Sequence, residues 1–183
     1  MPPSGRGSPW ERKMRFSPFP PPLAILMIPR GCKAAPVPES AVCMGVPKIA
    51  LQGRITDSAN ILSAEGEQQL SQRLAAYEQR TTHQMAVATT SALNGADPME
   101  FATCLGRRWG TGNAGRDDGI LILIAPNERQ SSIAVGYGLE KALTDVEAKA
   151  VIKDMIPSFQ KSDYASGLRI GIDAIAAQTG DSK

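Results

Sequence analysis

The sequence is poor in the side chains on which most catalytic and cofactor sites depend. It has one histidine, three cysteines and only 5% aromatic residues in 183 positions. Three cysteines so widely spaced predict neither a disulfide framework nor a zinc site, and we expect Cys104 to be a buried thiol on a helical face. His83 precedes an expected strand without a partner motif, so we expect it on the surface or at a cap.

Complete nucleotide and hydrolase motifs are also missing. Gly136-x-Gly138 has Lys141 where a dinucleotide fingerprint requires its third glycine. The segment 110–115 has the glycine spacing of a phosphate loop, but no Lys-Ser/Thr follows it and it comes after a helix instead of a strand. No Gly-x-Ser-x-Gly elbow occurs. There is no basic stripe for nucleic acid, and no run approaches the roughly 20 apolar residues of a membrane-spanning helix. Nucleotide, nucleic-acid and serine-hydrolase functions are therefore excluded.

Residues 1–48 differ sharply from the rest of the chain. They hold 11 of the 14 prolines and seven Lys/Arg against two Asp/Glu, whereas residues 49–183 hold 13 against 16. A basic start at 14–15 and the apolar run 23–28 resemble a signal peptide, although prolines interrupt the pattern. Cys32 and Cys43 are weak matches to a lipoprotein acceptor cysteine. We interpret 1–48 as a leader, signal or lipoprotein segment plus disordered linker; a purely disordered extension is the alternative.

Residues 49–180 have the composition of one α/β domain. After an extended stretch over 49–57, helical and strand periodicities alternate, and the crossover between two of the strands predicts a right-handed βαβ unit. The fold class is therefore α/β: one small mixed sheet with helices on both faces. The expected elements are helix 64–80, strand 84–90, a helix from Asp97, strand 119–125, antiparallel strand 131–136, a helix from Thr144 to about Met155, and helix 164–178.

Acidic residues at the ends of these elements are the main candidates for a site. Asp117 and Asp118 directly precede the apolar strand Ile120–Ala125, and adjacent carboxylates repel unless a cation lies between them. Either a hard divalent cation or Arg116 would meet that requirement. The candidate metal ligands are Asp57, Asp117, Asp118, Glu140 and Asp145. Asp145 is equally well explained as part of a helix cap.

The order of motifs resembles the TPM-domain family, named after thylakoid-lumen, photosystem II repair and receptor-modulator proteins. The match covers about 49–178 and includes Asp-x-Ala-x-x-Leu-Ser from Asp57, Asp-Asp-Gly from Asp117, and Gly-Tyr-Gly-Leu-Glu from Gly136. The resemblance implies a Rossmann-like three-layer sandwich without a bound nucleotide, export or membrane attachment, and an acidic pocket for a divalent cation, Ca²⁺ rather than Mg²⁺. It places Asp57 beside the Asp117-Asp118 pair in that pocket.

Two functions remain open at this stage. The first is an envelope module, periplasmic, lipoprotein-anchored or secreted, that acts as a monomer and supports assembly or repair of a membrane protein complex. The second is a metal-dependent acid phosphatase acting on phosphomonoesters, as reported for a plant relative, in which an ion held by Asp57, Asp117 and Asp118 activates water. The lack of a nucleophile–base pair favours the first.

Overall fold

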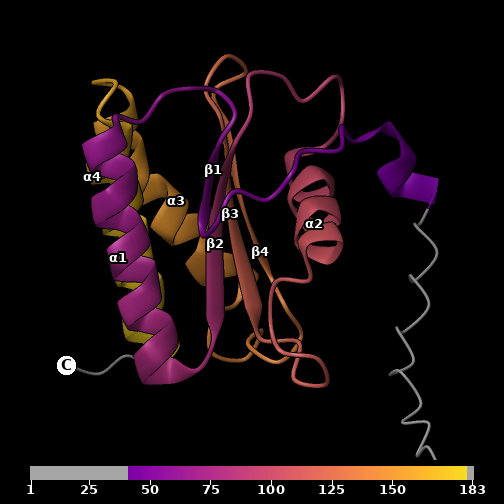
Figure 1. Cartoon of the computed structure of the whole chain (residues 1–183), viewed down its shortest axis with the longest axis vertical. Coiled ribbons are helices and arrows are strands. Elements are labelled where there is room, and N and C mark those ends of the chain that lie inside the picture. The colour runs from indigo at the N-terminus through magenta and orange to yellow at the C-terminus, as the bar shows by residue number, and fades with distance from the viewer. Residues whose placement is uncertain (1–40, 181–183) are drawn as a thin grey trace, which may run out of the picture. The chain divides into compact units, whose positions relative to one another are not determined.

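The apolar run before Pro126 forms the central strand of a four-stranded sheet. The computed structural model describes residues 41–180; the expectations for 1–40, including the signal-like run and Cys32, lie outside the described residues. The sheet order is β1-β2-β3-β4, with β1, β2 and β3 parallel and β4 antiparallel to β3 (Figure 1). The strands are β1 (Ile55–Asp57), β2 (Gln84–Thr89), β3 (Gly119–Ala125) and β4 (Gln130–Val135).

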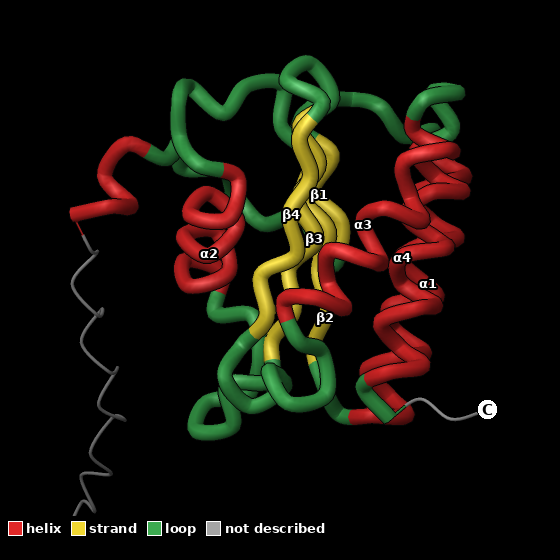
Figure 2. The backbone as a smooth tube through the Cα atoms, turned by 180° about the vertical axis from the view of Figure 1, so that it is seen from behind, coloured by secondary structure: helices red, strands yellow, loops and turns green. Residues whose placement is uncertain are grey.

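Strand β3 is apolar throughout because helices cover both faces of the sheet. Ile120, Ile122 and Ile124 alternate with Leu121 and Leu123, and each set packs into a different core. The first core includes α1 (Ala64–Thr81), α3 (Asp145–Phe159) and α4 (Tyr164–Gln178), and the second includes α2 (Pro98–Trp109). Figures 1 and 2 show α2 and the short 3-10 helix η1 (Ala41–Gly45) on one side of the sheet and α1, α3 and α4 on the opposite side. The expected three-layer α/β sandwich is confirmed.

The helices begin at the capping residues that the sequence predicts. The Ser63 side chain accepts a hydrogen bond from Gly66 N, Asp97 caps α2, and Thr144 forms a capping box with Glu147 at α3. Helix α4 has the predicted bounds, whereas α3 continues four residues past Met155, with a proline inside its last turn. No helix among residues 41–180 is long and apolar enough to cross a membrane.

Residues 43–51, which we call the strap, pack against α2. Cys43 forms a disulfide with Cys104, so the expectation of a free thiol at Cys104 is wrong. The Arg108 guanidinium donates hydrogen bonds to the backbone carbonyls of Cys43, Val46 and Pro47. The Trp109 Nε1–H donates to Ile49 O at 2.9 Å. The folded part of the chain therefore begins before Ile49.

Candidate functional site

The acidic residues singled out in the sequence lie at two opposite edges of the sheet. Asp57 ends β1, where it is paired with Thr89 at the end of β2. Asp117 and Asp118 precede Gly119, which pairs with Gln84 at the start of β2. Because β1, β2 and β3 are parallel, the length of β3, about 20 Å for its span at 3.3 Å per residue, separates the two positions. The expectation that Asp57 and the aspartate pair form one pocket is therefore wrong.

At the carboxyl edge, Asp57 holds the loop that leads into α1. One carboxylate oxygen accepts a hydrogen bond from Thr89 Oγ1, and the other accepts one from Leu62 N at 2.8 Å. Thr89 Oγ1 in turn accepts from Ala59 N at 3.0 Å. Asn60, inside the same loop, has a φ of 53°. This chain of bonds fixes a tight connection between β1 and α1, which is a sufficient structural reason for an aspartate at this position.

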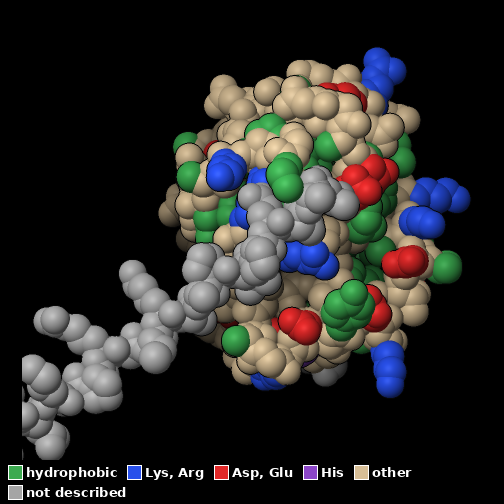
Figure 3. Space-filling view, turned by 90° about the vertical axis from the view of Figure 1, so that its right-hand side faces the viewer, with side chains coloured by type: hydrophobic (Ala, Val, Ile, Leu, Met, Phe, Trp, Pro, Cys, Tyr) green, Lys and Arg blue, Asp and Glu red, His purple; other side chains and the backbone are tan. Residues whose placement is uncertain are grey.

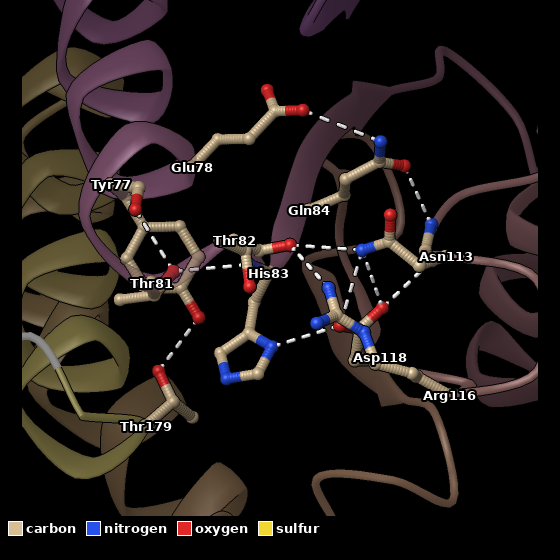
Figure 4. Close-up of polar contacts among 11 residues, drawn as sticks. Tyr77, Glu78, Thr81, Thr82, His83, Gln84, Asn113, Arg116, Asp118 and Thr179 are labelled. Carbon is tan, nitrogen blue, oxygen red and sulfur yellow. Dashed lines mark hydrogen bonds and ion pairs between the residues drawn. The ribbon is translucent and has the colours of Figure 1, made fainter.

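At the amino edge, Asp118 is the centre of a polar network (Figure 4). Its side chain is only 3% exposed. Asn113 donates to it from the backbone at 2.7 Å and from Nδ2 at 3.1 Å, His83 Nδ1 lies 3.0 Å away, and Arg116 forms an ion pair at 2.8 Å. Arg116 and Asn113 also donate to Thr82 O, at the end of α1. The network therefore connects α1, β2 and the loop before β3.

The hydrogen bonds around Asp118 keep its carboxyl ionised. Burial alone would raise its pKa, but the bonds from Asn113 and His83 and the charge of Arg116 outweigh burial and lower the pKa to about 2. An ionised carboxylate only accepts hydrogen bonds, so His83 donates its Nδ1–H. The outer ring nitrogen of His83, Nε2, has no protein partner among the described residues. Arg116 is thus the cation that the adjacent carboxylates require.

The other three acidic candidates are exposed. Asp117 has a φ of 47°, and its backbone oxygen accepts from Gly138 N at 3.0 Å. Glu140 follows in the same loop after β4, so it lies at the same edge as Asp117, and Asp145 is the first residue of α3. Within residues 41–180, no three His, Cys, Asp or Glu side chains are grouped so that they could hold a metal ion. The five candidates do not fit one shared ion.

The Gly-Tyr-Gly sequence after β4 allows the backbone there to pack closely against the backbone of the loop before β3. A Cβ on Gly136 would lie 2.0 Å from Asp117 O, and one on Gly138 would lie 2.0 Å from Arg116 O. Side chains at these two positions would therefore collide with the backbone that carries the network. Tyr137, between the two glycines, is 74% exposed. These glycines are required for packing, in agreement with the absence of a nucleotide motif.

Sequence reasoning missed His83 and Asn113 as members of the network. His83 was expected on the surface or at a cap, yet its ring contacts a carboxylate 35 residues away. Asn113 lies five residues before Asp118 in a glycine-rich loop, a position from which a short polar side chain can reach back to the backbone. That spacing was the available signal for Asn113. For His83 the signal was its place directly before β2, because Asp118 directly precedes β3 and the two strands are parallel neighbours.

Comparison with known proteins supports the resemblance seen in the motifs. The sequence model of the TPM-domain family matches residues 55–178 of this chain. The chain belongs to the TPM-domain family. The N-terminal domain of a protein from P. gingivalis, solved by NMR, is 32% identical with a TM-score of 0.63, covering 69% of this chain and 81% of that one. No curated protein matches.

Two further solved structures share the fold at lower identity. The N-terminal domain of cg2496 from Corynebacterium glutamicum is 18% identical with a TM-score of 0.58, and the comparison covers 75% of this chain and 89% of that one. The BA42 protein from Bizionia argentinensis is 20% identical with a TM-score of 0.56, covering 66% and 82%. The TPM fold is therefore retained here around a sheet whose two edges carry different polar groups.

Proposed function

We propose that this TPM domain is an exported binding module that supports assembly or repair of a protein complex in the cell envelope. The observation that carries the proposal is the disulfide between Cys43 and Cys104, which joins the strap to α2. Structural disulfides persist in oxidising compartments and are rare where glutathione and thioredoxin keep thiols reduced. The bond from Cys43 Sγ to Cys104 Sγ also argues against Cys43 as a lipid acceptor.

The polar network at the amino edge supports binding over catalysis. Asp118 stays ionised near neutral pH, so it has no proton to donate, and its oxygens are occupied by Asn113, His83 and Arg116. Among the described residues, the His83 ring has no hydrogen bond to a serine, threonine or cysteine side chain; its backbone N–H donates to Thr81 Oγ1 at 3.1 Å, and Cys43 and Cys104 are joined in a disulfide. A nucleophile activated by a base is therefore absent among residues 41–180.

One observation favours the phosphatase alternative. His83 Nδ1 lies 3.0 Å from the buried Asp118 carboxylate, and the His83 side chain is 23% exposed; in the neutral tautomer with Nδ1–H, Nε2 carries a lone pair. A histidine oriented in this way by an aspartate is the arrangement of a general base. With no second reactive group beside it, we rank hydrolysis of phosphomonoesters below binding.

A divalent cation remains part of the proposal, with Ca²⁺ favoured over Mg²⁺. Ca²⁺ accepts six to eight oxygen ligands in flexible geometry, including backbone carbonyls, whereas Mg²⁺ needs a near-octahedral set. Exposed loops such as those holding Asp117, before β3, and Glu140, after β4, suit the first ion better than the second. Asp57, at the other edge, would have to bind an ion separately.

The test of export uses the native cell. After fractionation, free thiols are blocked with a maleimide that adds mass, and the protein is compared with and without prior reduction. We expect it in the extracytoplasmic fraction with Cys43 and Cys104 protected until reduction. Reduced thiols at both positions in cytoplasmic protein would overturn the proposal.

The test of activity and cation binding uses purified protein. Hydrolysis of a generic phosphomonoester is measured with and without Ca²⁺ and Mg²⁺ for the wild type, Asp117→Ala/Asp118→Ala and His83→Gln. Activity that is abolished in the His83 variant would replace the binding proposal with the phosphatase alternative. Melting temperatures with Ca²⁺ are compared for Asp57→Ala and Asp117→Ala; a rise that one variant loses assigns the ion to that edge, and no rise removes the cation from the proposal.

A further inference from the structure

The surface formed by the strap and the end of α2 carries positive charge in a domain that is otherwise acidic. Residues 43–51 and 101–110 contain Lys48, Arg107 and Arg108 and no acidic residue, whereas residues 49–183 as a whole contain 13 basic and 16 acidic. Arg54 and Arg116, just beyond these ranges, are paired with Glu78 and Asp118. Lys48 and Arg107 are exposed. The acidic residues nearest in α2, the N-cap Asp97 and Glu100, are at its other end, about 10–15 Å from Arg107 along the helix axis. The positive charge is therefore local.

Apolar side chains are exposed on the same surface. Met44 is 74% exposed and Leu51 is 45% exposed, at the two ends of the strap. Between them, Lys48–Leu51 lines a shallow hollow of about 520 Å³ together with Arg108 and Trp109. Figure 3, which looks onto the side of the molecule that carries α2, shows basic, acidic and apolar side chains on that face. Basic residues beside exposed apolar residues are typical of surfaces that lie against a charged lipid interface.

The disulfide and the hydrogen bonds of the strap make this surface rigid. Cys43 is fixed to Cys104, and Trp109 is held to Ile49 O through its Nε1–H, so the strap follows α2 in one position. A pre-formed surface loses less conformational freedom on binding than a flexible peptide of the same composition. The strap is thus suited to present Met44, Lys48 and Leu51 together.

We propose that the strap surface, defined by Met44, Lys48, Leu51 and Arg107, binds an anionic lipid membrane. Each Lys or Arg near an anionic membrane is attracted by its negative surface potential, and the exposed Met44 and Leu51 side chains enter the boundary between headgroups and acyl chains. The described chain begins at Ala41, beside this surface. The inference rests on the proposed export.

The test is co-sedimentation of the full-length, oxidised chain with phosphatidylcholine vesicles that contain or lack phosphatidylglycerol, at low and high salt. Lys48→Glu/Arg107→Glu is compared with Lys149→Glu/Lys153→Glu, an identical charge change at exposed positions of α3. We expect wild-type binding that requires the anionic lipid, a loss of about tenfold or more in the strap variant, and wild-type binding in the α3 variant. Met44→Ser/Leu51→Ser should weaken binding without changing its salt dependence.

Three outcomes would overturn the inference: no binding by the wild type, equal binding to vesicles without phosphatidylglycerol, or equal loss in the two charge variants. Circular dichroism and protection of Cys43 and Cys104 from alkylation show whether each variant is folded. An exported protein that fails the vesicle test refutes only the membrane surface. Cytoplasmic protein with reduced thiols refutes the proposed function, whatever the vesicles show.

Discussion

Reduction of the disulfide between Cys43 and Cys104 should destabilise the domain strongly, because the bond closes a long loop. The two cysteines are 61 residues apart in the sequence. In the loop-closure model, a loop of that length removes roughly 14 cal/mol/K of entropy from the unfolded chain, or about 4 kcal/mol at 25 °C. For a domain of this size, that loss corresponds to a melting temperature lower by roughly 8–16 °C.

The measurement is urea and thermal unfolding of the oxidised wild type, the reduced wild type and Cys43→Ala/Cys104→Ala. The reduced protein and the double variant should agree, and reductant should leave the double variant unchanged. A midpoint that does not move on reduction would show that the strap detaches without affecting the rest of the fold. The strap would then not belong to the cooperative unit, which contradicts the buried positions of Cys43 and Cys104.

Three further predictions concern single residues. In acid titrations, the contribution of Asp118, whose folded pKa of about 2 lies below the unfolded value near 3.9, is complete above about pH 5 and is lost progressively as the pH falls toward 2; Asp118→Asn should remove that part of the acid transition, measured by circular dichroism. Gly136→Ala should cost about 1–3 kcal/mol in urea unfolding, while Gly45→Ala, where a Cβ meets nothing within 4 Å, should change stability by less than about 0.5 kcal/mol. Trp109→Phe removes the hydrogen bond to Ile49 O and should cost about 1 kcal/mol by the same assay.

The elements of the fold were predictable from the sequence because their signals are local. The alternation of capping residues and apolar spacing predicts α4 with its observed bounds, and the Ile120–Ala125 run predicts a strand buried on both faces. Each of these patterns lies within a single helix or strand, so it predicts that element without information on distant residues.

The candidate site was less predictable because it depends on strand direction and on contacts between distant residues. Asp57 ends a strand and Asp118 precedes one, so in a parallel sheet they must lie at opposite edges. The sequence predicts only an extended stretch over 49–57, so the parallel pairing of β1 with β2, which puts Asp57 at the far edge, could not be anticipated from it. The disulfide was missed for a different reason: the proline-rich composition before residue 49 assigned Cys43 to a leader, although residues from 43 onward are bound to α2.

The aspartate pair shows how one sequence motif divides into two roles. Adjacent carboxylates allowed two solutions, a metal ion or Arg116, and Asp118 has the second: it is buried, ionised and surrounded by donors. Asp117 points out of the network because its left-handed backbone conformation, with a φ of 47°, turns the chain there. An ion that used Asp118 would have to displace Arg116, His83 or Asn113 from bonds that hold three elements together. Asp117 is therefore the member of the pair that is free to bind a ligand, and Asp118 is the one that keeps the edge in place.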